Sequence, residues 1–190
     1  TITKREVTLT SETAEKPYDG TPLTRPTVKV EGDGFVDGEV RDLRATGTIT
    51  NVGRPVTNTI EYTGVESKFN ADNYEIKKHE GTLRITKAGK VGLTVEGAER
   101  KYNGEPLSAT KVETSVTKGT TISYSIDDGS TWTAEAPSIT NAGTLKVTVK
   151  AENPNYKTAT SEYTLTITKR EVTLTSETAE KPYDGTPLTR

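Results

Sequence analysis

The sequence predicts an all-β protein made of two small antiparallel β-sandwich modules arranged end to end. Three observations predict this fold. Apolar and polar residues alternate over short runs, turn-forming residues separate the runs, and landmarks of the first half of the chain recur in the second half. Threonine is abundant, and this β-branched residue favours strands with one wet face.

The expected strands are runs in which every second side chain is apolar. They are Val7/Leu9, Val28/Val30, Ile60/Tyr62 and Leu83/Ile85 in the first module, and Val91/Leu93/Val95, Ile122/Tyr124/Ile126, Leu145/Val147/Val149/Ala151 and Leu165/Ile167 in the second. Five to seven short strands in roughly 80 residues fit a small immunoglobulin-like sandwich. The alternative is a β-grasp-like sheet, which needs a crossing helix, and no segment has helical apolar spacing.

Turn-forming residues separate the runs. The sequence Asp127-Asp128-Gly129-Ser130 predicts a hairpin turn between Ile126 and Trp132, with the glycine in the left-handed conformation. Prolines cannot donate a ladder hydrogen bond and therefore indicate edges or loops. They stand at Pro17, Pro22, Pro26, Pro106 and Pro137.

The chain contains a perfect internal repeat. Residues 1–25 and 166–190 are identical, so the repeating unit is 165 residues long. The unit is itself double, because Tyr-x-Gly, Ile-Thr-Asn-x-Gly and Asn-Tyr landmarks recur in the same order. We expect the end of a preceding module at 1–3, a first module at 4–87, a second at 88–168 and the truncated start of a third at 169–190.

The connections between modules are short. Only Ala88-Gly89-Lys90 separates the run ending at Lys87 from the strand at Val91, and no Gly/Ser-rich or Pro-rich linker is present. A last strand that passes almost directly into the next first strand leaves little freedom to bend. We therefore expect a semi-rigid rod.

The composition excludes several classes of function. The net charge is −2, from 25 Lys and Arg against 27 Asp and Glu, so no basic face for nucleic acid is expected. The sequence has no Cys, and no apolar run approaches the ~18 residues of a membrane span, so we expect no membrane insertion. The one histidine, His79, lies in a charged stretch without a second ligand. We expect no cofactor, no metal and no enzymatic activity.

Three motifs carry a resemblance to a known family. They are the Lys-x-Tyr-Asp-Gly box ending at Gly20, the Thr-Asn-Ala-Gly run at 140–143 and the Asn-Pro-Asn-Tyr turn at 153–156. The chain resembles the YDG/MBG-type tandem repeat domains of large bacterial cell-surface adhesins, especially Gram-positive ones. The resemblance implies a secreted, cell-wall-anchored protein whose repeats form a stalk. The second module departs from the box, because Asn103 replaces the aspartate.

The leading functional hypothesis is a structural spacer that projects a distal binding region, with neighbouring repeats of the same chain as partners. The alternative is an adhesive module that binds a host glycan or matrix protein weakly per unit and strongly by multivalency. Candidate ligand residues for that role are Trp132, Tyr18 and Tyr102. The competing interpretation is structural: each tyrosine packs at a sandwich edge before an Asx-Gly turn, and the tryptophan is partly buried.

Two further alternatives concern ions and covalent links. The acidic turn at Asp127-Asp128 supplies oxygen ligands that suit Ca²⁺, but it has no Ca²⁺-loop spacing, so we expect solvated acids. Lys–Asn isopeptide cross-links occur in wall-anchored adhesins. The recurring candidates are Lys4, Lys87 and Lys169 with Asn51 and Asn141.

Residues 169–190 carry a first strand without the module that would bury it. An unpaired strand edge recruits a partner. We expect this segment to be disordered, or to exchange into a neighbouring molecule in place of the identical residues there.

Overall fold

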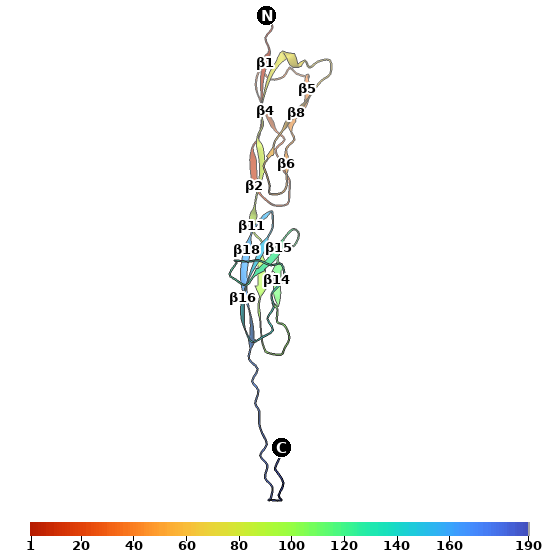
Figure 1. Ribbon diagram of the computed structural model, residues 1–190. Coiled ribbons are helices and arrows are strands. Elements are labelled where there is room, and N and C mark those ends of the chain that lie inside the picture. The colour runs from red at the N-terminus through yellow and green to blue at the C-terminus, as the bar shows by residue number, and fades with distance from the viewer. Residues whose placement is uncertain (190) are drawn as a thin grey trace.

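The computed structural model of the protein describes residues 1–189. Within that range the protein is all-β, and its one helical element is the short 3₁₀-helix η1 (Ala71–Asn73). The strands form two β-sandwich modules that lie end to end, with the C-terminal segment extending beyond the second (Figure 1). The predicted fold class is confirmed, and the β-grasp alternative is wrong because no crossing helix is present among the described residues.

Each module contains several short paired strands. The first has β1 (Arg5–Ser11), β2 (Ala14–Pro17), β3 (Leu23–Thr24), β4 (Val28–Gly32), β5 (Val40–Ala45), β6 (Thr48–Ile49), β7 (Val56–Thr57), β8 (Ile60–Gly64), β9 (Tyr74–His79) and β10 (Thr82–Thr86). The second has β11 (Ala88–Lys90), β12 (Leu93–Glu96), β13 (Ala98–Lys101), β14 (Lys111–Thr114), β15 (Thr121–Ser125), β16 (Gly143–Glu152), β17 (Tyr156–Lys157) and β18 (Ala159–Thr168). The main sheets have the strand orders β4-β1-β9 and β2-β10-β7 in the first module and β13-β18-β16-β15 in the second.

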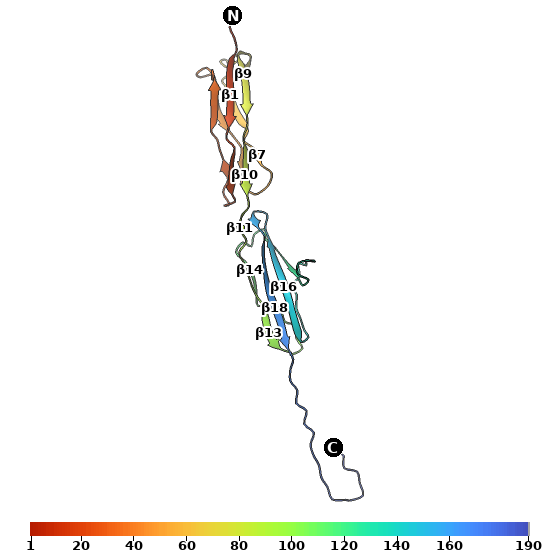
Figure 2. The same ribbon diagram turned by 90° about the vertical axis from the view of Figure 1, so that its left-hand side faces the viewer.

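The first and last strands of each module run side by side in the same direction. In the first module β1 pairs in parallel with β9, and β2 pairs in parallel with β10. In the second module β11 and β13 pair in parallel with β17 and β18. The other pairings are antiparallel, as the sequence predicts. A strand that enters at one end of a module and a strand that leaves at the other end must point the same way, so these neighbours are parallel (Figure 2).

A buried asparagine holds the first module together where β1 gives way to β2. The Asn58 side chain is fully buried, and its Nδ2 donates to the carbonyls of Glu12 at 3.1 Å and Arg25 at 2.9 Å. Its Oδ1 accepts from the N–H of Gly47 at 3.1 Å. Because buried polar groups are costly unless bonded, this side chain fixes three backbone segments at once. No pattern in the sequence marks this asparagine as buried.

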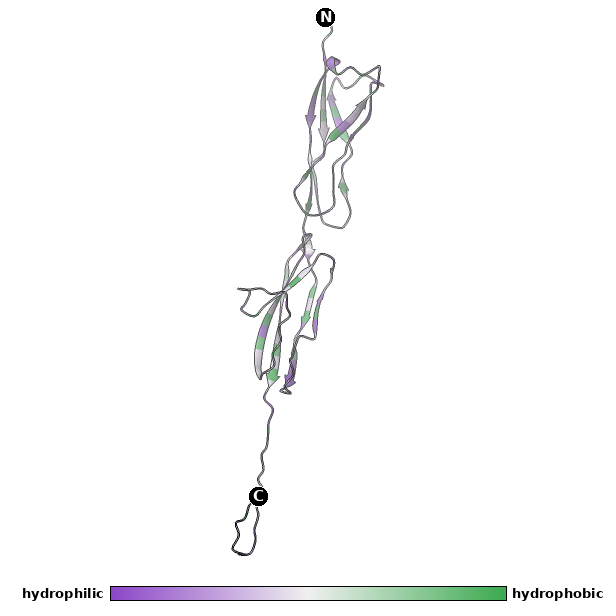
Figure 3. Ribbon diagram, turned by 45° about the vertical axis from the view of Figure 1, so that its right-hand side comes forward, coloured by the Kyte–Doolittle hydropathy of each residue, from purple (hydrophilic) through white to green (hydrophobic). Residues whose placement is uncertain are grey.

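The cores of the two modules differ in chemistry. Figure 3 shows hydrophobic and hydrophilic segments alternating along the strands of both modules. At the N-terminal end of the first module, the core combines Val7, Leu9 and Ile60 with an aromatic cluster of Phe35, Tyr62, Phe69 and Tyr74. We call this the upper core. The core of the second module is mainly aliphatic and consists of Leu107, Tyr124, Val147, Val149, Tyr163, Leu165 and Ile167.

Two of the buried tyrosines, Tyr74 and Tyr163, have opposite hydrogen-bonding states. The Tyr74 hydroxyl donates to Glu39 at 2.6 Å and accepts from the N–H of Val36 at 3.0 Å. Burial, followed by the bond to Glu39, raises the pKa of Tyr74. The buried Tyr163 hydroxyl has no partner among the described residues, and burial raises its pKa too.

Two apolar residues of the expected strands lie on the surface. Val30 is 40% exposed because β4 is an edge strand of its sheet. Ile126 is 59% exposed because β15 ends at Ser125, where the chain turns into the acidic loop. Alternation therefore located both strands but overestimated the burial of their outer residues.

Residues 169–189 contain no strand and extend away from the second module (Figure 2). Val172 and Leu174 are 73% and 90% exposed. Their counterparts in the identical first segment, Val7 and Leu9, are completely buried. The same apolar side chains are thus present twice, once in a core and once in solvent.

We expect the same substitution to act with opposite sign at the two tyrosines. Tyr163→Phe removes an unpaired buried hydroxyl and should raise the free energy of unfolding of the second module by about 1 kcal/mol, whereas Tyr74→Phe removes two bonds and should lower that of the first by about 1 to 3 kcal/mol. Calorimetric scans of both variants against the unmodified chain measure this. A destabilised Tyr163→Phe variant would contradict the assignment.

The exposed apolar face of residues 169–189 should drive strand exchange. We expect concentration-dependent oligomers in sedimentation velocity, and their loss when residues 169–190 are deleted. Leu174→Asp should also abolish them, because Leu9 at the equivalent position is buried. Thr173→Asp is the matched control, since its side chain points to the other face. Oligomers that survive the deletion would exclude this mechanism.

Candidate functional site

The Tyr-Asp-Gly box forms a closed hydrogen-bonded turn. Lys16 Nζ contacts both carboxylate oxygens of Asp19, at 2.8 and 3.0 Å, and the hydroxyl of Thr21 at 2.6 Å. The backbone N–H of Thr21 donates to Asp19 Oδ1 at 2.8 Å. Gly20 has φ +82°, a left-handed conformation that glycine adopts without strain. The bonds from Lys16 and then Thr21 hold the pKa of Asp19 well below its usual range.

The same turn forms without a surrounding module. In the extended C-terminal segment, Lys181 Nζ lies 2.8 Å from Asp184 Oδ1, which also accepts from the N–H of Thr186 at 3.0 Å. The second module keeps the core of the turn with an amide, because Asn103 Oδ1 accepts from the N–H of Glu105 at 3.0 Å. The box is therefore a locally encoded turn whose polar groups already bind each other.

The three predicted ligand residues occupy three separate places. Tyr18 is half-buried, and its ring meets Tyr156 of the second module edge-on, with centroids 5.5 Å apart. Tyr102 lies at the opposite end of the second module and is 40% exposed. Trp132 lies on the loop that follows β15. The structure therefore does not bring these aromatic rings into one binding surface.

The tryptophan loop is closed by its own polar groups. Trp132 is 37% exposed, its Nε1 donates to the carbonyl of Gly129 at 3.0 Å, and Lys150 Nζ lies 4.4 Å from its ring centroid. The ring forms one wall of an open hollow of about 330 Å³. This arrangement satisfies the indole N–H and places a cation over the ring.

Asp127 holds this loop. Its Oδ1 accepts from the hydroxyl of buried Ser125 at 2.6 Å and from the N–H of Thr131 at 2.9 Å, and its Oδ2 accepts from the Thr131 hydroxyl at 2.6 Å. The bond from Ser125, followed by those from Thr131, lowers the pKa of Asp127 from 3.8 to about 2. The acid that was a candidate Ca²⁺ ligand is thus committed to the turn.

Hydrogen bonds of one asparagine, Asn155, connect the two modules at their joint. Asn155 Oδ1 accepts from the N–H of Val52 at 2.8 Å, and its Nδ2 donates to Asn51 Oδ1 at 3.1 Å. Its carbonyl accepts from the N–H of Ala88 at 2.9 Å. One residue of the second module therefore binds both a loop of the first module and the start of β11. We call these three bonds the asparagine clasp.

A second asparagine orients the clasp. Asn153 is buried, and its Nδ2 donates to the carbonyl of Lys118 at 3.1 Å and to Thr120 Oγ1 at 2.9 Å. Its Oδ1 accepts from the N–H of Asn155 at 3.0 Å. Bonds within the second module therefore fix the turn at 153–156, independently of its contact with the first module. The sequence identified this motif as a turn but did not predict its contact with Asn51.

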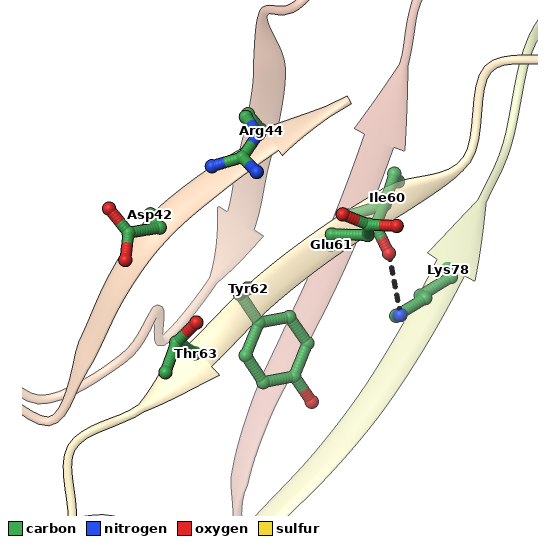
Figure 4. Close-up of a pocket in the computed structure, with 7 residues that line it drawn as sticks. All are labelled: Asp42, Arg44, Ile60, Glu61, Tyr62, Thr63 and Lys78. Carbon is green, nitrogen blue, oxygen red and sulfur yellow. Dashed lines mark hydrogen bonds between the residues drawn. The ribbon is translucent and has the colours of Figure 1, made fainter. Parts of the chain in front are cut away.

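An open hollow of the first module lies beside β5 and β8 (Figure 4). Its residues are Asp42, Arg44, Ile60, Glu61, Tyr62, Thr63 and Lys78. A register shift between Arg41 and Arg44 opens the pairing there, and Asp42 has φ 56°. Lys78 Nζ donates to the Ile60 carbonyl at 2.8 Å. The acidic and basic side chains of this hollow alternate around a shallow polar surface. They include no nucleophile with a neighbouring base.

The remaining titratable residues do not form a metal-binding cluster among the described residues. No group of three or more His, Asp or Glu side chains stands close enough to hold a metal ion within residues 1–189. His79 is exposed at the end of β9. Asp33 Oδ2 accepts from the N–H of Glu6 at 3.0 Å. No helix in this part of the chain is long and apolar enough to cross a membrane.

No protein-family model matches the chain, and no curated protein matches it. Among solved structures, the crystal structure of Drosophila N-cadherin EC1-4 is similar over 88% of this chain and 51% of that chain, at 9% sequence identity and a TM-score of 0.28. The chain thus spans about half the length of that structure. A similarity at this level leaves function to the geometry of the chain itself.

The low pKa of Asp127 predicts how the tryptophan loop responds to acid. A depressed carboxyl pKa contributes stability that is present above 3.8 and is lost as the pH falls toward about 2. Because Trp132 is the only tryptophan, its fluorescence reports this loop. We expect fluorescence to stay constant down to about pH 4 and to change between about pH 4 and 2.

Asp127→Asn should remove this acid transition and leave a loosened loop at neutral pH, while far-UV circular dichroism verifies that the modules stay folded. Asp128→Asn is the matched control, because the Asp128 carboxylate bonds Lys146, at 3.2 Å, on the outside of the loop and does not bond Ser125 or Thr131 among the residues that the structure describes. An unchanged transition in Asp127→Asn would refute the role of this carboxylate.

Proposed function

We propose that the chain is a length of stalk: spacer repeats of a bacterial cell-surface adhesin that hold a distal binding region away from the cell. The observation that carries the proposal is the joint between the modules. Lys87 alone separates β10 from β11, and β11 is already paired with β17 inside the second module. The side chain of Asn155 then binds the second module to the end of the first at the same point.

The strand order supports an extended molecule. Because the first and last strands of a module are parallel neighbours, the chain enters and leaves at opposite ends (Figure 2). The strand path over residues 5–17 corresponds to roughly 40 Å at about 3.3 Å per residue. Each further module therefore adds its full length to the array. A compact arrangement would require a reversal that the joint does not provide.

The exposed edges support a rod that stays separate from its neighbours. Edge strand β4 carries Lys29 paired with Glu31 at 2.6 Å, and edge strand β14 carries Lys111 paired with Glu113 at 3.4 Å. Exposed ion pairs stabilise a fold little. Charged residues on edge strands do prevent sideways sheet pairing. A long molecule that exposes its edges along its whole length needs this protection.

The extracellular, cell-wall-anchored location in this proposal derives from the family resemblance of the three turn motifs. The absence of cysteine agrees with it. An adhesive role for the repeats themselves is the competing hypothesis, with Trp132 as its main candidate residue. The three aromatic candidates lie far from one another along the chain path and do not form a common surface, so the spacer role is preferred.

Solution scattering tests the proposal. We expect the chain to scatter as a rod, with a two-module length of roughly 70–90 Å from about 3.3 Å per strand residue. Asn155→Ala removes both side-chain bonds across the joint and should broaden the distribution of inter-module angles. Asn141→Ala is the matched control, because that asparagine lies away from this joint. A compact profile for the unmodified chain would overturn the stalk function.

A further inference from the structure

The first module contributes Tyr18 and the loop of Asn51 and Val52 to the joint. The C-terminal end of the second module carries the equivalent tyrosine and loop. Tyr102 corresponds to Tyr18, and its N–H donates to the Thr168 carbonyl at 2.9 Å as that of Tyr18 does to Thr86. The Ile-Thr-Asn-x-Gly loop is positioned in the same way, since Ile139 pairs with Leu107 as Ile49 pairs with Leu23. These backbone pairings are antiparallel in both modules. The two loops therefore stand equivalently in their modules.

This end is exposed in the structure. Asn141 and Ala142, the counterparts of Asn51 and Val52, are both exposed, as is Tyr102. Tyr102 and Ala142 line an open hollow of about 450 Å³ together with Lys169, Arg170 and Val172. The chain thus leaves the second module past this surface, as residues 87–88 leave the first module past Tyr18 and Val52.

The complementary half lies at the other end of the first module. Asn73-Tyr74 corresponds to Asn155-Tyr156 in the order of landmarks. Asn73 is exposed at the end of η1, which lies beside the N-terminal end of the module (Figure 1). Tyr74 is buried in its own aromatic cluster, so its ring does not repeat the contact between Tyr18 and Tyr156. The asparagine is the part of the clasp that is carried over.

We propose that the exposed end of the second module is the docking surface for the first module of the following repeat, a second copy of residues 4–87. Asn73 of that repeat takes the place of Asn155, accepting from the N–H of Ala142 and donating to Asn141 Oδ1. The identity of residues 166–190 with 1–25 specifies this occupant, because the next module begins with the same sequence as the first. The inference rests on the proposed stalk function, since it requires a tandem array.

A chain in which the 165-residue unit is present twice tests the proposal. The sequence has no cysteine, so introduced cysteines carry spin labels at unique positions. One pair, Thr24→Cys and Thr160→Cys within the first unit, reports the joint described above. The second pair, Ser108→Cys in the first unit and Glu75→Cys in the second, reports the proposed joint. Ser108 follows Leu107 as Thr24 follows Leu23, and Glu75 lies two residues after Asn73. All four positions are exposed.

We expect narrow distance distributions of similar width for both pairs. Asn141→Ala in the first unit should at least double the width for the second pair and leave the first pair unchanged. Asn155→Ala in the first unit should do the reverse, so each variant is the control for the other. Asn73→Ala in the second unit should reproduce the effect of Asn141→Ala, because it removes the other half of the same clasp.

The outcomes separate the two proposals. A broad distribution for the second pair in the unmodified chain, with a narrow one for the first, overturns the docking surface and leaves the stalk intact. Broad distributions for both pairs overturn the stalk function as well. A narrow second pair that Asn141→Ala and Asn73→Ala do not change means that another contact holds the joint, which also overturns the asparagine assignment.

Discussion

The parallel pairing of the first and last strands is the constraint on which the rest of the molecule depends. In a purely antiparallel meander, neighbouring strands reverse direction, and the chain can return to the end where it began. Here β1 and β2 run beside β9 and β10 in the same direction, so the chain enters and leaves the module at opposite ends. The same rule holds for β13 beside β18. Linear stacking follows from this pairing before any contact between modules is considered.

Sheets this thin need polar anchors, because the apolar content is low. Hydrophobic residues make up 30% of the sequence, and the buried apolar side chains fall into four separate clusters. Asn58 in the first module bonds three backbone groups, and Asn153 in the second bonds two backbone groups and the Thr120 hydroxyl. A buried asparagine with all its polar atoms bonded specifies one arrangement of the segments that it bonds. At the joint, the bond from the N–H of Asn155 to Asn153 Oδ1 holds the turn in place.

Local patterns in the sequence predicted the strands and turns well, because both are local. Alternation located β16 and β18, and the Asx-Gly turns form even in the extended C-terminal segment. The parallel pairing was not predictable, since it depends on which strands meet across about 69 positions of sequence, as Arg5 meets Tyr74. The roles of Asn58 and Asn155 were also hidden. An asparagine in a polar sequence gives no signal of burial or of a partner in another module.

Comparison of the two modules indicates where the molecule tolerates change. The upper core is aromatic in the first module and the core of the second is mainly aliphatic, so either chemistry fills the same sandwich. The features that the modules share lie at their ends: the tyrosine before the Asx-Gly turn, the Ile-Thr-Asn-x-Gly loop and the Asn-Tyr corner. A ligand-binding role for each unit would predict shared residues on a side surface, yet Trp132 has no counterpart in the first module. Sequence similarity concentrated at the ends is what the proposed stalk requires, because the angle at each joint decides how far an array of such modules reaches.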